Sequence, residues 1–273
     1  MTVLGRRELP PLLRAIHDPP RQLYLRGNGD PALLTQPAVA VVGARACSPY
    51  GAQVARALGR DLAAAGVVVV SGLARGVDCE AHRGALDAGG HTVAVLGCGI
   101  DRDYPAAHTS LARAITERSL LLSEYEAGIE PAPWRFPARN RIVAGLCAAT
   151  VVVEARERSG ALITADFALD EGREVFAVPG EITSALSAGT NELLRLGASP
   201  LTRTSDVLDA LGIAPAEPGE EAKAHPLLEL LPASADELVR ASGLPAGEVA
   251  AVLAELEIAG LASEGEGVFR RSG

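Results

Sequence analysis

The sequence predicts an α/β protein: an extended, Rossmann-like, doubly wound and mostly parallel sheet, plus a small C-terminal winged-helix domain. Short apolar, β-branched runs recur along residues 39–178, and runs without alternating polar positions are typical of strands that are buried on both faces. Helix-length stretches separate these runs, and strand–helix alternation indicates a parallel sheet covered by helices. Residues 225–273 carry three short helical patterns and a hairpin pattern instead, which favours a separate module.

The N-terminal segment, residues 1–37, is short and punctuated by prolines. Residues 9–16 are expected to form a helix that Pro19 and Pro20 end, and residues 23–25 a brief strand. This segment is too small to bury a core of its own, so we interpret it as a lead-in that packs on the main domain.

The main domain is predicted to span residues 38–212. Its strands are expected at residues 39–42, 67–70, 92–96, 120–122, 150–153 and 174–178. Its helices are expected at residues 50–65, 77–88, 105–116, 140–147 and 161–171. Because strands and helices alternate along the chain, the helices are expected to cover both faces of one parallel sheet.

A linker rich in Pro, Gly and Glu is predicted at residues 213–224, followed by the C-terminal module at 225–273. Helices are expected at residues 226–231, 234–242 and 245–260, with a hairpin within 261–270; Ser234 and Glu237 form a capping-box pattern. The third helix, which would be the reading helix of a DNA binder, carries Glu248, Glu255 and Glu257 and no Lys or Arg. Residues 214–273 hold 11 acids against 4 bases, a net charge of −7. We therefore expect this module to contact proteins rather than to bind duplex DNA tightly.

Composition limits the classes of function. The formal net charge of −9 excludes a surface covered with phosphate-binding groups, so any anion site must be local. No apolar run reaches the length of about 18–20 residues that a spanning helix needs, and the N-terminus lacks the apolar core of a secretory signal, so we expect no membrane contact. The four cysteines lie apart with no CxxC pair, which indicates reduced thiols in a cytoplasmic protein.

Glycine and polar residues follow most of the predicted strands. In doubly wound sheets ligands bind beyond the carboxyl ends of the strands, and glycine there permits close approach of backbone N–H groups. Tight strand-to-helix turns also need glycine for their own geometry, so a glycine in a single loop does not by itself indicate a ligand site. Six such loops on one edge of the sheet favour a ligand groove. The six loops are residues 43–45, 71–76, 97–101, 123–125, 154–160 and 179–181.

Residues 134–164 concentrate the side chains that suit a nucleic-acid strand. Arg135, Arg139 and Arg141 surround Phe136 and Asn140, and we expect Asn140 to cap the helix that follows. Further on, Ser159 and Gly160 open a second helix with Thr164 in its first turn. Cations, an aromatic ring and a helix start are a combination that can hold phosphates and stack on bases.

Two alternatives stay open for this stretch. Arg139 and Arg141 could instead pair with acidic residues such as Glu124 or Glu154 and brace the sheet edge, an arrangement that suits Arg141 better than Arg139. Phe136 could equally be a core residue.

The sequence nominates no catalytic residue, cofactor or metal. There is no GxGxxG after the first strand and no Walker GxxxxGK[ST] motif. Asp78 and His82 lie four residues apart, a spacing that allows an acid–base pair but that also suits a helix-dipole Asp beside a packed His. Asp101 and Asp103 have no His or Cys at ligand spacing. No serine sits in a G-x-S-x-G elbow.

Taken together, the motifs resemble the DNA-processing protein A (DprA, also called Smf) family. The resemblance covers about residues 9–211, in the family's order, through VAVVGAR, VVSGLARGVD, VAVLGCGID with Tyr104-Pro105, LLSEY, FPARNRIVAGL, VVVEA, SGALIT and VFAVPG. It implies a cytoplasmic homodimer without catalytic activity that binds incoming single-stranded DNA in natural transformation. It also implies protection of that DNA and loading of the RecA recombinase.

The resemblance also implies a set of DNA-binding residues. Arg45 matches the arginine of the family's GxR motif, with Ser48 in the same loop, and Phe136 to Arg141 match its F-P-x-R-N-R motif. The phosphate-approaching loops are matched by Gly72, Gly76, Gly97, Gly99, Ser159, Gly160 and Thr164. Two departures stand out: residues 1–37 resemble only the trailing linker of the helical domain that many members carry in front, and Pro133 stands where a basic residue is expected. We expect Arg135 to supply that charge.

An alternative function is a nucleotide or nucleoside-phosphate hydrolase of the lysine-decarboxylase-like type, which has a glycine-lined pocket on a similar sheet. That class uses a PGGxGT…E signature, and the nearest match, Pro179-Gly180-Glu181, lacks it. A purely structural interaction module is the third reading, and it predicts binding of neither nucleotides nor DNA.

Overall fold

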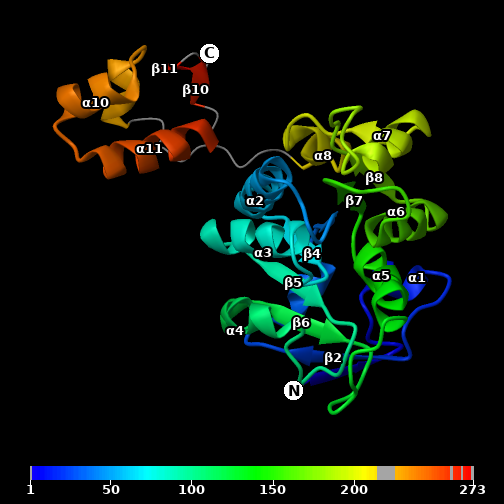
Figure 1. The fold of residues 1–273 in the computed structure, drawn as a ribbon. Coiled ribbons are helices and arrows are strands. Elements are labelled where there is room, and N and C mark those ends of the chain that lie inside the picture. The colour runs from blue at the N-terminus through cyan, green and yellow to red at the C-terminus, as the bar shows by residue number, and fades with distance from the viewer. Residues whose placement is uncertain (1, 214–224, 259–260, 266, 272–273) are drawn as a thin grey trace. The chain divides into compact units, whose positions relative to one another are not determined.

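A computed structural model describes residues 2–213, 225–258, 261–265 and 267–271. Contacts divide the chain into two compact units, Met1–Ile213 and Ala214–Gly273 (Figure 1). Apart from Ile213, the predicted linker falls outside the described residues. Within the described part of the chain, no helix combines the length and the apolar character needed to cross a bilayer.

The first unit is built on one nine-stranded sheet in the order β1-β2-β6-β5-β4-β3-β7-β8-β9. Strands β3 to β9 pair in parallel with their neighbours, whereas β2 pairs antiparallel with both β1 and β6. The predicted doubly wound, mostly parallel sheet is therefore confirmed. The strands are β1 (Thr2–Gly5), β2 (Gln22–Arg26), β3 (Ala38–Val42), β4 (Val68–Ser71), β5 (Thr92–Val95), β6 (Leu120–Ser123), β7 (Ala149–Val152), β8 (Glu174–Ala177) and β9 (Ser199–Pro200).

The direction of winding reverses between β3 and β7. The chain runs outward from β3 through β4 and β5 to β6, then crosses back so that β7 pairs with the other side of β3 and β8 and β9 follow. At such a switch point the two connecting segments leave the sheet in opposite directions, which opens a crevice above the carboxyl ends of the strands.

Helices cover both faces of the sheet because alternate strand residues are buried on opposite sides. In β3, Ala40 and Val42 join a core with α1, α5, α6 and α7, while Val39 and Val41 join a core with α2, α3 and α8; α4 packs on the second face near β5 and β6 (Figure 1). The helices are α1 (Pro11–Ala15), α2 (Pro49–Ala64), α3 (Val77–Asp87), α4 (Thr109–Arg118), α5 (Arg135–Gly145), α6 (Gly160–Asp170), α7 (Ala188–Arg195) and α8 (Ser205–Ala210), with short 3₁₀ turns η1 (Pro31–Thr35) and η2 (Ala106–His108).

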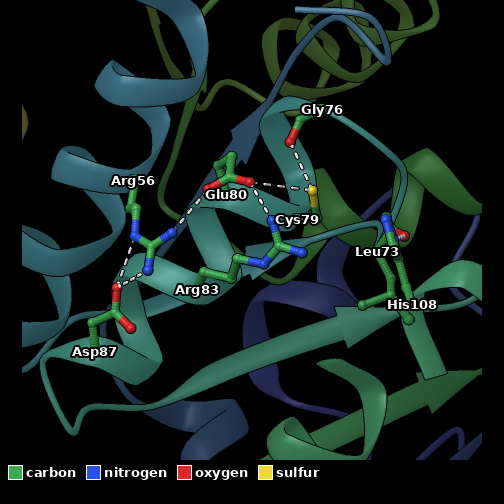
Figure 2. Close-up of polar contacts among 8 residues, drawn as sticks. All are labelled: Arg56, Leu73, Gly76, Cys79, Glu80, Arg83, Asp87 and His108. Carbon is green, nitrogen blue, oxygen red and sulfur yellow. Dashed lines mark hydrogen bonds and ion pairs between the residues drawn. The ribbon is translucent and has the colours of Figure 1, made fainter. Parts of the chain in front are cut away.

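Helices α2 and α3 pack unusually closely because glycines remove two side chains from their contact. A Cβ on Gly59 would lie 2.2 Å from the Ala81 carbonyl oxygen, and one on Gly84 would lie 2.0 Å from that of Arg56. Outside this contact, Arg56 forms ion pairs with Glu80 and Asp87 of α3 (Figure 2). These contacts hold α3 against α2.

The structure corrects one local prediction. Helix α5 begins at Arg135, so Asn140 lies inside the helix, and the N-cap is Trp134 without a side-chain capping bond. Pro137 is tolerated as the third helical residue because the first four N–H groups of a helix have no intrahelical acceptor. As a result, the arginines and Phe136 are presented from a rigid helix rather than from a loop.

The second unit is the winged-helix domain that the sequence predicts. It contains η3 (Pro226–Leu230), α10 (Ala235–Ser242), α11 (Ala246–Ile258), β10 (Ala262–Gly265) and β11 (Val268–Arg271), and Ala233 bridges to Phe269 beside the hairpin. Its core is formed mainly by leucines of the three helical segments. The capping box of Ser234 and Glu237 is confirmed. Glu248 is exposed, whereas the side chains of Glu255 and Glu257 lie outside the described residues.

Candidate nucleic-acid interface

A cavity of about 220 Å³ lies at the switch point. Its walls are the carboxyl ends of β3 and β4, helix α5 and the N-terminus of α6. Eight of the fourteen residues predicted to bind DNA meet there: Arg45, Gly72, Phe136, Arg139, Asn140, Ser159, Gly160 and Thr164. The other lining residues are Val42, Gly43, Ala74, Asp78, Pro137, Val143 and Ala161.

Arg139 forms the charged floor of the cavity. Its side chain is only 4% exposed, and Nη1 donates to the carbonyl oxygens of Gly72, at 2.9 Å, and of Val95. Burial lowers the pKa of Arg139 to about 10, against the opposing effect of Asp78, so the guanidinium stays charged at neutral pH. Gly72 makes this position accessible, since a Cβ there would lie 2.4 Å from Nη2 of Arg139.

Asp78 fixes the loop that forms one wall. Its Oδ2 accepts hydrogen bonds from the backbone N–H groups of Gly72, at 3.1 Å, and Ala74, at 3.3 Å. Burial raises the pKa of this carboxyl, while Arg139 acts to lower it. Arg45 and Arg139 line the same cavity, which therefore carries two cations against at most one anion and favours a negatively charged ligand.

The same loop is held from outside the cavity. Leu73 adopts a left-handed backbone with φ 58°, and its carbonyl oxygen accepts a hydrogen bond from His108 Nδ1 at 2.9 Å. The carbonyl oxygen of Gly76 accepts from Cys79 Sγ at 3.1 Å; Figure 2 shows both contacts. Gly76 itself has φ 77° and lies where a Cβ would be 2.2 Å from the carbonyl oxygen of Ala44.

The acid–base pair considered for Asp78 and His82 is not supported by the structure. His82 is fully buried, and its Nδ1 lies 2.6 Å from Oγ1 of Thr92. Burial lowers the pKa of His82 to about 3, so the imidazole is neutral at physiological pH. Each side chain therefore stabilises a different part of the fold, in agreement with the packing alternative.

An aromatic and cationic cluster lies at one side of the cavity. The Arg45 guanidinium carbon lies 5.6 Å from the centroid of the Phe136 ring, within the range of cation–π attraction. Phe136 is half-buried rather than part of the core, and it stacks on Tyr104. Gly97 lies against the ring, since a Cβ there would be 2.8 Å from Cδ1 of Phe136.

The N-terminus of α6 forms the opposite side. The Ser159 Oγ caps the helix by accepting from the Ala161 N–H at 3.3 Å, and a Cβ on Gly160 would meet open space. The positive end of the helix dipole at this N-terminus attracts anions. Asn140 joins the two helices, because its Nδ2 donates to the carbonyl oxygen of Gly160 at 3.0 Å.

Six of the fourteen predicted residues do not line the cavity: Ser48, Gly76, Gly97, Gly99, Arg135 and Arg141. Ser48 is bonded to Glu154 through both its backbone N–H and its hydroxyl. Gly99 is pressed against the loop around Glu126. The guanidinium of Arg135 lies 4.9 Å from the ring centroids of both Tyr125 and Trp134. Direct DNA contact stays a prediction for all fourteen residues.

Arg141 is held in internal ion pairs. Its guanidinium binds both carboxylate oxygens of Glu124, at 2.9 and 2.8 Å, and Nε lies 3.0 Å from Asp18 Oδ2. Its side chain is only 13% exposed. The structure thus agrees with the brace alternative for Arg141. Within the described part of the chain, Arg139 instead donates hydrogen bonds to Gly72, Val95 and Asn140, none of which is acidic.

Sequence reasoning missed two residues that shape the site. Asp78 is predicted either as an acid–base partner or as a helix-dipole residue, although it lines the cavity and holds its loop. Tyr104 belongs to the family resemblance but is not among the predicted DNA-binding residues, although it is 44% exposed in a chain with 3% aromatic residues. The scarcity of aromatic residues was the available signal. Asp101 and Asp103 serve the fold, accepting from the Gly128 N–H and pairing with Arg26. Among the described residues, no three His, Cys, Asp or Glu side chains converge as metal ligands would.

The fold and the cavity together define a Rossmann-like protein with an anion-attracting crevice at its switch point. The sequence matches the family model of DNA recombination-mediator protein A over residues 1–212 and that of the DprA winged helix domain over residues 213–267. The chain therefore belongs to the DprA/Smf family.

Named relatives support this membership. The chain is 48% identical over 200 residues to the DNA processing protein DprA of Streptococcus pneumoniae, covering 72% of this chain and 68% of the relative. The X-ray structure of that protein matches with a TM-score of 0.72 at 44% identity, over 76% of this chain and 73% of the other. A putative DprA of Mycobacterium tuberculosis is 44% identical over 248 residues, which is 85% of this chain and 64% of the relative. The chain thus spans about two thirds of the length of these two curated relatives.

A solved structure of DNA processing protein A from Helicobacter pylori, described for its single-stranded DNA binding mode, matches with a TM-score of 0.70 at 34% identity. It covers 77% of this chain and 94% of the other.

Proposed function

We propose that the chain binds single-stranded DNA at the switch-point cavity. The observation that carries this proposal is the convergence of two arginines, one of them almost fully buried, with an aromatic cluster and a helix N-terminus. Arg45, Arg139 and the first turn of α6 would bind phosphates, and Phe136 would stack on a base. A single strand offers both groups at once, whereas a duplex hides the faces of its bases.

A salt titration of oligonucleotide binding tests this proposal. Arg45 is exposed, so Arg45→Ala should leave the fold intact, weaken single-strand binding and reduce the salt slope by about 0.7, the value for one lost phosphate contact on a single strand. Arg139→Lys should weaken binding as well, because lysine cannot reproduce the planar guanidinium. Arg203→Ala, which removes an exposed arginine paired with Asp206, is the matched control. Unchanged affinity and slope in both site variants would exclude the assignment.

The wider role follows from the family. We propose that the chain acts in the cytoplasm as a homodimer, that it protects incoming DNA, and that it loads the RecA recombinase in natural transformation and recombination. The four cysteines are free thiols, which suits a reducing compartment. Sedimentation equilibrium tests the dimer. RecA-dependent ATP hydrolysis on an oligonucleotide that is already bound by this protein tests the loading step.

We further propose that the site binds without catalysis. Incubation with nucleoside monophosphates and with oligonucleotides should release neither free base nor cleaved strand. Release of base would instead favour the hydrolase alternative.

A further inference from the structure

The ring of Tyr104 stacks on Phe136, one of the residues that line the cavity. It belongs to the loop that follows β5, is 44% exposed, and stacks on Phe136 with centroids 5.2 Å and planes 29° apart. Phe136 is itself contacted by the guanidinium of Arg45 and by Gly97. Because three neighbours already cover the half-buried Phe136 ring, the more exposed aromatic surface at this side of the cavity belongs to Tyr104.

We propose that Tyr104 is a second stacking residue of the single-strand site. It takes a base next to the nucleotide held in the cavity, and Phe136 supports the tyrosine ring from behind. This inference rests on the proposed single-strand binding and adds to it a residue that is not among the fourteen predicted DNA-binding residues. Every base has a π-face, so the contact is expected to tolerate any sequence.

The position of Tyr104 relative to the charged groups supports this assignment. Phe136 connects it to Arg45, and Arg45 and Arg139 line the same cavity as the N-terminus of α6. A strand with its phosphates near the arginines would place neighbouring bases on the aromatic side. The phenol hydroxyl is not needed for stacking, so the ring alone should carry the effect.

The experiment compares Tyr104→Ala and Tyr104→Phe in the full chain, using fluorescence anisotropy with a labelled single strand and with the same strand made abasic. Tyr104→Ala should weaken binding of the normal strand about 5- to 150-fold, the range for loss of one base–aromatic stack. It should leave binding of the abasic strand and the salt slope unchanged, because no phosphate contact is lost. Tyr104→Phe should bind both strands as the unaltered protein does.

Two outcomes would overturn the proposal. Equal weakening on normal and abasic strands would assign Tyr104 a structural role, and unchanged binding by Tyr104→Ala would assign it none. Arg45→Ala in the same assay separates this inference from the proposed function. If Arg45→Ala weakens binding while Tyr104→Ala does not, only the stacking role falls; if the unaltered protein does not bind the strand, both proposals fall.

Discussion

Arg139 shows how a guanidinium can be kept charged inside a fold. Two carbonyl oxygens satisfy Nη1, and the nearby carboxyl of Asp78 partly offsets the cost of burial. Buried charges need such partners because an unpaired one would be strongly destabilising. The carbonyl oxygens carry no formal charge, so the side chain remains an electrostatic attractant for a phosphate in the cavity.

Gly72 is expected to be essential for this arrangement. In Gly72→Ala the new Cβ would lie 2.4 Å from Nη2 of Arg139, so the guanidinium must shift. We expect single-strand affinity to fall roughly tenfold and stability to fall by about 1–3 kcal/mol, as in other overpacked sites. Anisotropy and urea unfolding measure the two effects. Gly247→Ala lies in helix α11, where a Cβ would meet open space, so it should leave affinity unchanged and should not lower stability. Equal losses in the two variants would contradict the prediction.

His82 predicts a specific dependence of stability on pH. Burial lowers its folded-state pKa to about 3, below the value of about 6.5 expected in the unfolded chain. Between these values only the unfolded state binds the proton, so stability that is present above pH 6.5 is lost as the pH falls. From pH 7 to pH 5 this loss should be about 2 kcal/mol. Urea unfolding of the unaltered protein and of His82→Gln should differ by this slope, and parallel pH profiles would refute the assignment.

At the scale of elements, Arg141 ties α5 to two other parts of the first unit. It binds Glu124, directly after β6, and Asp18, in the segment between α1 and β2. Arg141→Ala should lower the free energy of unfolding by about 1.5–3 kcal/mol, the range for hydrogen bonds to charged groups. Single-strand affinity of the folded protein should change little. A large loss of affinity without a loss of stability would instead make Arg141 a DNA contact.

The sequence allowed the central strands and the helices between them to be predicted, because strands buried on both faces give continuous apolar runs. Edge strands β1 and β9 escaped prediction: β1 is partly exposed and β9 has only two residues, so neither shows a burial pattern. The start of α5 was predicted too late in the sequence, because Pro137 was taken to precede the helix. The first turn of a helix tolerates proline, and Pro137 lies within it.

The site was predictable to the extent that it is local in sequence. Residues 136–141 and 159–164 could be recognised as short motifs on one chain segment. The division of labour between Arg139 and Arg141 could not, because it depends on acceptors far away in sequence: Gly72 and Val95 for the first, Asp18 and Glu124 for the second. The roles of Asp78 and Tyr104 likewise depend on neighbours that are distant in sequence and that the folded sheet brings together.

At the scale of the whole molecule, charge is shared unevenly. The chain has 34 acidic and 25 basic residues, of which residues 214–273 hold 11 acidic and 4 basic ones. The remaining residues therefore hold 23 acidic and 21 basic residues, a net charge of −2. Removal of the acidic C-terminal unit should therefore leave single-strand affinity unchanged or modestly increased, because the rest of the chain is almost neutral.

The measurement is a salt titration of the full chain against a chain that ends at residue 213, with single-stranded and duplex oligonucleotides. Affinity that falls on truncation, or salt-dependent duplex binding that the truncated chain lacks, would show that the winged-helix domain binds DNA itself.

Hydrogen bonds fix the loop after β4 that forms one wall of the cavity before any ligand binds. Asp78 accepts from the backbone N–H groups of Gly72 and Ala74, His108 contacts the carbonyl oxygen of Leu73, and Arg139 donates to that of Gly72. A ligand therefore has little backbone to order on arrival, and the conformational entropy lost on association is small. Binding of single-stranded DNA should then be a single bimolecular step. Its observed rate should rise in proportion to the DNA concentration and should not level off, as it would if a conformational rearrangement were limiting.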